Sequence, residues 1–182
     1  DPPRGAVTWE PTPGGCLNAA ELVSLIKSEY GDYFGIAVAG FPEGYPSQLG
    51  EIDLDLDVKY LKAKVDAGAD FVLTQFFYDS SVFINFVARC RAGGISCPIL
   101  PGMMPIQSFS SFQRMASLCG TSVPDSIWES LSTIKADDEA VKSFGVSLCH
   151  KMCLELIEAG IPGFHFYTLN LERSVLAVLK EL

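Results

Sequence analysis

Three side chains that could contact a ligand stand at the ends of short apolar runs. Phe41 follows the run at 36–40, Gln75 closes the run at 71–75, and Tyr167 lies near the end of a third run. The amide of Gln75 offers both a hydrogen-bond donor and an acceptor, which suits recognition of a planar ligand with an amide-like edge. A hydrogen bond from Gln75 to a neighbouring loop is the alternative interpretation.

The other reactive residues form weaker patterns. Cys149 and Cys153 lie one helical turn apart, but a zinc site requires four ligands and no second pair accompanies them. We therefore expect no metal site. His150 and His165 have no nucleophilic serine motif nearby, which disfavours a hydrolase. The acidic stretch 51–57 lacks the ligand spacing of a calcium loop and instead precedes a helix, where carboxylates interact favourably with the helix dipole.

The elements that must position these side chains can be predicted from periodicity. Apolar runs at 36–40, 71–75 and 164–168, with a weaker one at 98–101, predict four strands. Because the runs are continuously apolar, we expect parallel strands covered on both faces. Amphipathic patterns predict helices at about 17–30, 56–67, 80–92, 108–119, 124–132, 139–159 and 171–182.

This alternation of strand and helix fits either an open doubly wound sheet or a (β/α)8 TIM barrel. No strand is followed by a GxGxxG phosphate fingerprint, which favours the barrel. A complete barrel takes about 250 residues and eight strands. We therefore expect an incomplete α/β barrel.

Barrel enzymes place their active sites at the carboxyl ends of the strands. In this chain the rule brings four groups around one mouth: Phe41, Gln75, the turn at 102–105 and Tyr167. The small residues Ala37, Ala39 and Gly40 would leave room there for a flat ring, since barrel interiors usually hold bulkier Val, Ile and Leu. Tight packing is the alternative explanation for those small residues.

Composition excludes several classes of partner. The 22 acidic and 13 basic residues give a net charge of −9, and no cluster of Lys and Arg could neutralise a nucleic acid or an anionic membrane. No apolar run reaches the roughly 18 residues of a membrane-spanning helix. The six cysteines lie mostly in apolar contexts, which favours a reducing, cytoplasmic location. The sequence starts at Asp1 with neither a Met nor the apolar stretch of a signal peptide, so we expect a chain truncated in front.

Several segments together resemble the methylenetetrahydrofolate reductase family. Their order, spacing and placement agree nearly end to end, and the stretch Tyr167-Thr168-Leu169-Asn170 is especially distinctive. The matching segments are Val38-Ala39-Gly40-Phe41-Pro42-Glu43, Lys64-Val65-Asp66-Ala67-Gly68-Ala69-Asp70, Thr74-Gln75-Phe76-Phe77, Pro101-Gly102-Met103-Met104-Pro105 and Phe164-His165-Phe166-Tyr167-Thr168-Leu169-Asn170.

The resemblance implies that residues 1–182 are part of a catalytic, FAD-binding (β/α)8 barrel, of which they supply about strands five to eight. It also implies hydride transfer from NADPH or NADH to FAD and then to 5,10-methylenetetrahydrofolate, which yields 5-methyltetrahydrofolate for methionine synthesis. The family's general acid is a glutamate on the first strand, so we expect these 182 residues alone to be inactive. The full-length protein is expected to form a homo-oligomer. A non-catalytic half-barrel and a pterin- or nucleotide-binding barrel module are the alternatives.

The resemblance also implies roles for individual residues. Asp1 would lie near the flavin and the pterin and tune their electrostatics as a catalytic residue, and Gln75 and Tyr167 match positions that contact folate or nicotinamide. Leu171 stands where several members carry an arginine that contacts folate, and Asn18 and Tyr45 replace residues that are often Tyr and His. Lys64 would meet a phosphate. The positions that match flavin contacts, besides Asp1, are Asn18, Ala19, Ala39, Phe41, Tyr45, Pro46, Ser47, Gln48, Asp57 and Lys64.

Overall fold

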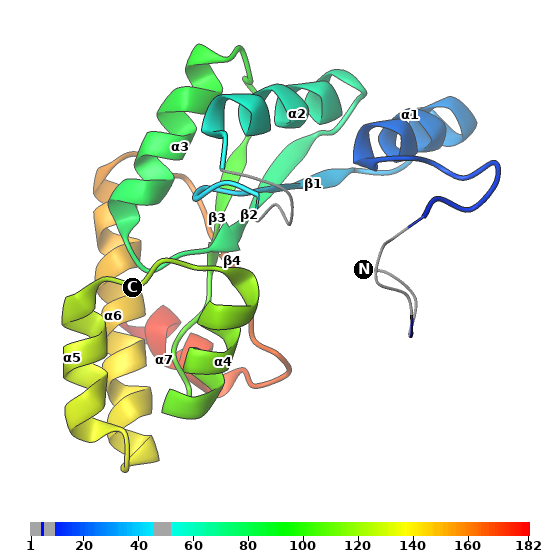
Figure 1. Cartoon of the computed structure of the whole chain (residues 1–182). Helices are drawn as coiled ribbons and strands as arrows, with labels where there is room; N and C mark the ends of the chain where they lie inside the picture. The colour runs from blue at the N-terminus through cyan, green and yellow to red at the C-terminus, as the bar shows by residue number, and fades with distance from the viewer. Residues whose placement is uncertain (1–4, 6–9, 46–51) are drawn as a thin grey trace.

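A computed structural model describes residue 5 and residues 10–45 and 52–182. Four of the predicted contact positions, Asp1, Pro46, Ser47 and Gln48, lie outside the described residues. Four parallel strands form one sheet in chain order (Figure 1). They are β1 (Ala37–Gly40), β2 (Phe71–Phe76), β3 (Ile99–Met103) and β4 (His165–Phe166).

Helices connect the strands and pack against one another in series. α1 contacts α2, α2 contacts α3, α3 contacts α6, and α6 contacts α7, while α4 and α5 are added between β3 and α6 (Figure 1). Sequential parallel strands with crossover helices give the architecture of a partial (β/α)8 barrel, which confirms the predicted fold class. The helices are α1 (Ala19–Tyr30), α2 (Leu54–Asp66), α3 (Ser80–Ala92), α4 (Phe109–Cys119), α5 (Asp125–Ile134), α6 (Asp138–Glu158) and α7 (Arg173–Glu181).

The two faces of the sheet differ in burial. Val38, Val72 and Thr74 are buried on the face that the helices cover. The prediction that both faces are covered is wrong for this chain. The interior of a (β/α)8 barrel is filled by side chains from all eight strands, and the four strands described here supply only part of that layer. Exposed or half-buried residues occupy the other face: Ala37, Ala39, Phe71, Leu73 and Gln75.

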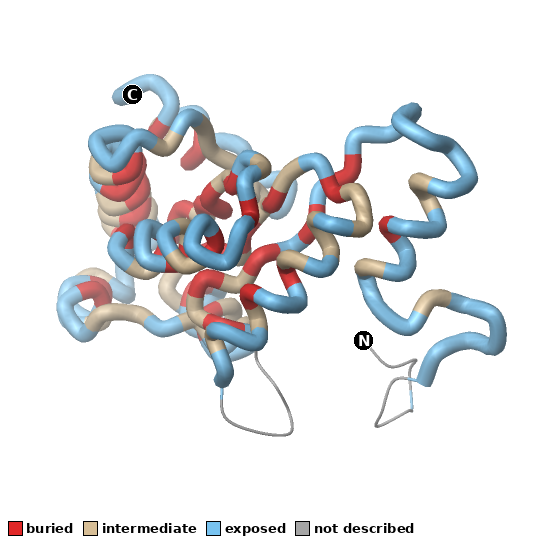
Figure 2. Tube along the Cα trace, turned by 90° about the horizontal axis from the view of Figure 1, so that it is seen from above, coloured by how far each residue is buried: buried red, intermediate tan, exposed pale blue. Residues whose placement is uncertain are grey.

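Two clusters of buried side chains hold the helices in place. The larger lies between the sheet and its helices and includes Phe83, Leu156 and Val178. The smaller joins the end of β2 to α4, α5 and α6, where the rings of Tyr78 and Phe112 meet edge to face with centroids 5.0 Å apart. α1 remains mostly exposed, and Val23 is its buried residue (Figure 2).

Two strands differ from their predicted lengths. The run at 98–101 gives the weakest strand signal, yet β3 has five residues and pairs on both sides. Pro101 lowers the predicted strand propensity because it has no N–H, and it lies where the pairing of β2 with β3 shifts register. In the run at 164–168 the strand comprises only His165 and Phe166, Tyr167 adds one backbone hydrogen bond to Met103 at 2.8 Å, and a left-handed turn follows at Leu169.

Within the described residues, no helix is long and apolar enough to cross a membrane. All six cysteines are free thiols. The side chains of Asp79 and Ser108 cap α3 and α4, because each accepts a backbone N–H from the first turn of its helix.

Candidate functional site at the carboxyl ends of the strands

The turn at 41–45 follows the carboxyl end of β1 and is fixed by side chains from two helices. Asp57 in α2 accepts the backbone N–H of Tyr45 through its Oδ2 atom at 2.7 Å. Arg89 in α3 donates from Nη2 to the carbonyl oxygen of Pro42 at 3.2 Å. These contacts hold the backbone of the turn in one conformation above the strand.

A third contact ties the same turn to the connection between α4 and α5. Both carboxylate oxygens of Glu43 lie within 3.2 Å of the backbone N–H of Ser122. Burial raises the pKa of Glu43, the hydrogen bond from Ser122 opposes that rise, and the charge of Asp79 adds to it. Sequence reasoning missed the roles of Glu43 and Arg89, because their partners lie 79 and 47 residues away and no local pattern reveals them.

The turn carries an aromatic pair next to an open part of the sheet. The rings of Phe41 and Tyr45 meet edge to face with centroids 4.9 Å apart, and Tyr45 is 56% exposed. Ala39 is exposed on the open face of β1. Gly40 points to the covered face, where a Cβ atom would lie 2.8 Å from Val72, so tight packing explains this small residue.

Lys64 brings a positive charge to the same strand end. Its Nζ donates to the carbonyl oxygen of Ala39 at 2.6 Å, which leaves further N–H donors on the ammonium group. Burial lowers the pKa of Lys64, and the nearby charge of Asp57 opposes that change. A partly desolvated ammonium group held against the backbone can bind an anionic group such as a phosphate.

The ends of β2, β3 and β4 are joined by a second set of contacts. The hydroxyl of Tyr167 donates to the carbonyl oxygen of Thr74 at 3.0 Å, and the buried Oγ1 atom of Thr74 accepts the N–H of Gly102 at 3.0 Å. A Cβ atom on Gly102 would clash with the carbonyl oxygen of Thr74 and the ring of Tyr167. Only glycine therefore lets the tyrosine ring cross β3 and reach β2.

Gln75 lies directly beside this junction. Its Oε1 accepts the N–H of Phe76 at 3.1 Å, so the oxygen is satisfied by the adjacent backbone and not by a neighbouring loop. No other hydrogen bond to the Gln75 side chain occurs within the described residues.

The structure thus brings five of the predicted cofactor positions together at the end of β1: Ala39, Phe41, Tyr45, Asp57 and Lys64. Asn18 and Ala19 begin α1, and the side chain of Asn18 caps that helix by accepting the N–H of Glu21 at 3.0 Å. Its role in cofactor binding stays a prediction.

A partly open cavity beside the ends of β2 and β3 is far too small to hold a cofactor. It has a volume of about 10 Å³ and is lined by Tyr78, Met103, Cys149 and neighbouring apolar side chains, which is room for about one water molecule. Cys149 and Cys153 are buried, and the described residues contain no group of three or more His, Cys, Asp or Glu placed to hold a metal ion. This cavity and the buried cysteine pair therefore offer no cofactor or metal site within the described residues.

Comparison with known proteins gives matches along the whole chain. The family model described as "Methylenetetrahydrofolate reductase" matches residues 1–182. The chain is 45% identical over 188 residues to "Methylenetetrahydrofolate reductase (NADH) 1" of Arabidopsis thaliana and 45% identical over 183 residues to "Methylenetetrahydrofolate reductase 2" of Saccharomyces cerevisiae. Both alignments cover 100% of this chain, but only 32% and 30% of those relatives. The chain thus spans about a third of their length.

A bacterial relative and a solved structure extend the comparison. The "5,10-methylenetetrahydrofolate reductase" of Pectobacterium carotovorum is 39% identical over 166 residues, covering 91% of this chain and 54% of that protein. A solved structure described as "Uncharacterized protein from Clostridium thermocellum binds two copies of 5-methyl-5,6,7,8-tetrahydrofolic acid" aligns with a TM-score of 0.64 at 18% identity. It covers 90% of this chain and 57% of that chain. At this identity the likeness supports the fold alone.

Proposed function

Because this chain belongs to the methylenetetrahydrofolate reductase family, we propose that the protein reduces 5,10-methylenetetrahydrofolate to 5-methyltetrahydrofolate with FAD as cofactor. NADH or NADPH is the proposed electron donor, and the product feeds methionine synthesis. The observation that carries the proposal is the match of the family along residues 1–182. We further propose that these residues are part of a catalytic barrel domain in a cytoplasmic homo-oligomer.

The residues at the end of β1 fit a flavin dinucleotide. Lys64 offers a half-buried positive charge for a phosphate, and Ala39 and the Phe41–Tyr45 pair offer a small and an aromatic surface for a flat ring. A flavin held by these residues would supply the chemistry of hydride transfer between the nicotinamide and the folate. The chain's own part is to bind and orient: Asp57, Glu43 and Arg89 fix the turn that carries the aromatic pair.

The residues at the ends of β2 and β4 fit the substrate side of the same mouth. The NH₂ group of Gln75 can donate to a carbonyl oxygen on a pterin or a nicotinamide. The hydroxyl of Tyr167 donates its proton to the carbonyl oxygen of Thr74, so the proposed ligand contact of this residue is through its ring. Asp1 completes the proposed contacts and lies outside the described residues.

A reduced-folate-binding barrel without a redox role is the second candidate function. The Clostridium thermocellum protein, which shares the fold, is described as binding two copies of 5-methyl-5,6,7,8-tetrahydrofolic acid, but at 18% identity that likeness extends to the fold alone. The same mouth residues would serve such a protein, since one fold hosts many functions. The presence of bound flavin separates the two candidates.

The decisive experiment is a visible spectrum of the purified full-length protein under anaerobic conditions. We expect a yellow flavin spectrum that bleaches when NADH or NADPH is added and recovers when methylenetetrahydrofolate follows. Both nucleotides should be tried, because the curated relatives carry names with NADH and with NADPH. A folded, colourless protein that binds 5-methyltetrahydrofolate would reject the reductase and favour the binding barrel.

A pair of lysine variants tests the placement of the cofactor. Lys64→Met should weaken FAD retention by about tenfold to a hundredfold, because a hydrogen bond to a charged group contributes about 1.5–3 kcal/mol. Lys62→Met is the matched control, since Lys62 lies on the same helix and instead pairs with Asp66. Equal FAD retention by the two variants would contradict a phosphate contact at Lys64.

A further inference from the structure

The turn that follows β4 holds two consecutive residues in the left-handed backbone region. Leu169 has a φ of 48° and Asn170 a φ of 61°, and within the described part of the chain they alone combine a side chain with a positive φ. Asparagine tolerates this region, whereas leucine is strained there. Leu169 is 67% exposed, so burial does not offset the strain. Such strain persists only where surrounding contacts impose it, and it clusters at ligand-binding sites.

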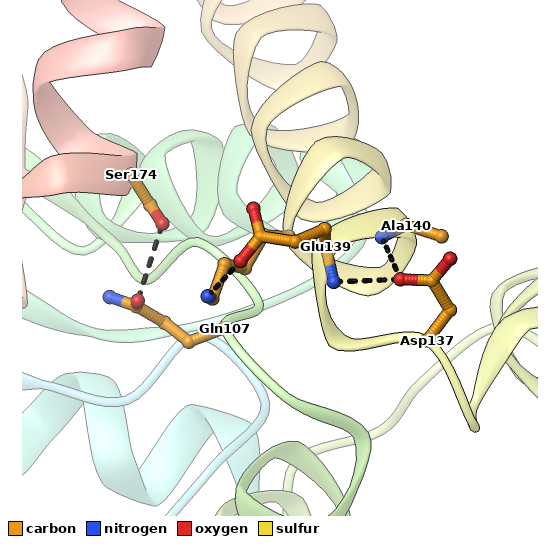
Figure 3. Close-up of polar contacts among 6 residues, drawn as sticks. Gln107, Asp137, Glu139, Ala140 and Ser174 are labelled. Atoms are coloured by element: carbon orange, nitrogen blue, oxygen red, sulfur yellow. Dashed lines mark hydrogen bonds and ion pairs between the residues drawn. The ribbon is translucent and has the colours of Figure 1, made fainter.

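A glutamine from a different loop supplies the imposing contacts. The turn closes through a hydrogen bond from the N–H of Leu171 to the carbonyl oxygen of Thr168 at 2.8 Å. Gln107, between β3 and α4, donates its side-chain NH₂ group to the carbonyl oxygen of Leu171 at 3.1 Å. The hydroxyl of Ser174, at the start of α7, donates to the side-chain oxygen of Gln107 at 3.3 Å (Figure 3). These two bonds fix the orientation of the amide.

The burial of Ser174 makes this arrangement specific. Ser174 is 5% exposed, so its hydroxyl needs a partner within the protein. Gln107 provides that partner and at the same time holds the turn through Leu171. We refer to Gln107, Ser174 and the carbonyl group of Leu171 as the Gln107 clamp. It ties the loop after β3, the turn after β4 and the start of α7 into one unit.

The clamp lies where the carboxyl ends of two neighbouring strands meet. β3 and β4 pair directly, and Tyr167 lies two residues before the strained Leu169. We propose that Gln107 is a positioning residue, which holds the turn at 168–171 in its left-handed conformation and so pre-forms part of the folate-binding surface. Leu169 and Leu171, both exposed, would then offer a fixed apolar surface to the ligand. This inference rests on the proposed function.

The first test separates folate binding from the rest of catalysis in the full-length protein. Gln107→Ala should raise KM for methylenetetrahydrofolate about tenfold, because the turn is no longer pre-formed. The value of kcat, and the rate at which NADH or NADPH reduces the flavin without folate, should change by less than about twofold, since neither depends on pre-forming the turn. Gln113→Ala is the matched control, because Gln113 is exposed on the nearby α4. A folded Gln107→Ala variant with an unchanged KM for the folate would overturn the proposal.

Variants of the partner residue test the same clamp from its other end. Ser174→Ala should raise KM for the folate in the same direction, and Ser174→Thr, which keeps the hydroxyl group, should restore it. If Gln107→Ala does not fold, the KM of Ser174→Ala for the folate is the test of the proposal. A loss of stability with no separation of KM from kcat would reduce the clamp to a structural contact and overturn the positioning role.

Hydrogen exchange distinguishes failure of the clamp from failure of the reductase. The amide of Leu171, which closes the turn, should exchange faster in Gln107→Ala than in the unsubstituted protein, whatever reaction the protein catalyses. Unchanged exchange at 168–171 would refute the clamp. An unsubstituted protein that holds no flavin would refute the reductase while faster exchange still supported the clamp.

Discussion

Replacement of Gly102 by alanine tests whether the junction of β2, β3 and β4 is as close as the structure shows. The added Cβ atom would clash with the carbonyl oxygen of Thr74 and lie 2.7 Å from the ring of Tyr167. Overpacking of this kind costs about 1–3 kcal/mol, and loss of the hydrogen bond from Tyr167 to Thr74 adds about 1 kcal/mol. We therefore expect Gly102→Ala to lower the free energy of unfolding by about 3 kcal/mol.

The assay is thermal unfolding followed by circular dichroism. For a domain of this size, about 1 kcal/mol corresponds to about 2–4 °C, so Tm should fall by about 6–12 °C. Gly163→Ala is the matched control, because its Cβ atom would lie 3.8 Å from Leu100, an ordinary contact. It should change Tm by no more than a few degrees. A Gly102→Ala variant that unfolds within about 2 °C of the unsubstituted protein would refute the close approach.

Three further substitutions test the hydrogen bonds and charges at the strand ends. Tyr167→Phe removes only the hydroxyl bonded to Thr74 and should cost about 1 kcal/mol in urea unfolding; no measurable loss would mean that the bond is absent in solution. Burial raises the pKa of Glu43 above its ordinary 4.5. The contribution of this group to the stability of the folded protein is therefore fully present below pH 4.5 and is lost as the pH rises through the raised pKa. The free energy of unfolding of Glu43→Gln should therefore rise relative to that of the unsubstituted protein between about pH 4 and about pH 7. The change should be less than about 1 kcal/mol because Glu43 is half exposed. A difference between the two proteins that does not depend on pH would contradict this. The hydrogen bond from the N–H of Ile36, at 2.7 Å, lowers the pKa of Asp70 below its ordinary 3.8. The contribution of Asp70 to the stability of the folded protein is therefore fully present above pH 3.8 and is lost as the pH falls through the lowered pKa. Asp70→Asn should thus be less stable than the unsubstituted protein at about pH 7, and the gap in urea unfolding should narrow in acid; a constant gap would argue against the charge of Asp70 as the cause.

The elements of this protein were largely predictable because local sequence decides them. α3 begins and ends where its pattern predicted, since Asp79 caps its first turn and its apolar positions recur at helical spacing. The strand that begins at Phe71 was predictable for the same reason, because a continuous apolar run between turn signals is typical of a buried strand. The length of β3 was underestimated because Pro101 weakens a strand locally, while the register shift that accommodates it involves β2.

The candidate site was predictable in part. The rule that active sites gather at strand carboxyl ends placed Phe41, Gln75 and Tyr167 at one mouth, and the family resemblance added Asp57 and Lys64. The contacts that hold these residues were invisible, because Glu43 and Arg89 find their partners across 79 and 47 residues. The sequence predicts a ligand contact at Tyr167, whereas the structure shows that the hydroxyl of this residue donates to the carbonyl oxygen of Thr74.

The sequence by itself determined the periodic elements, the α/β class and the family to which the chain belongs, because each depends on patterns within short segments or on motifs in a fixed order. Only the tertiary structure decided which side chains remain free for a ligand. Hydrogen-bonding groups such as those of Tyr167 and Gln107 are claimed by whichever partner the fold brings within about 3 Å, and those partners come from distant strands and loops. The turn that contains the left-handed residues Leu169 and Asn170 likewise receives a hydrogen bond from a remote glutamine, which no local pattern predicts.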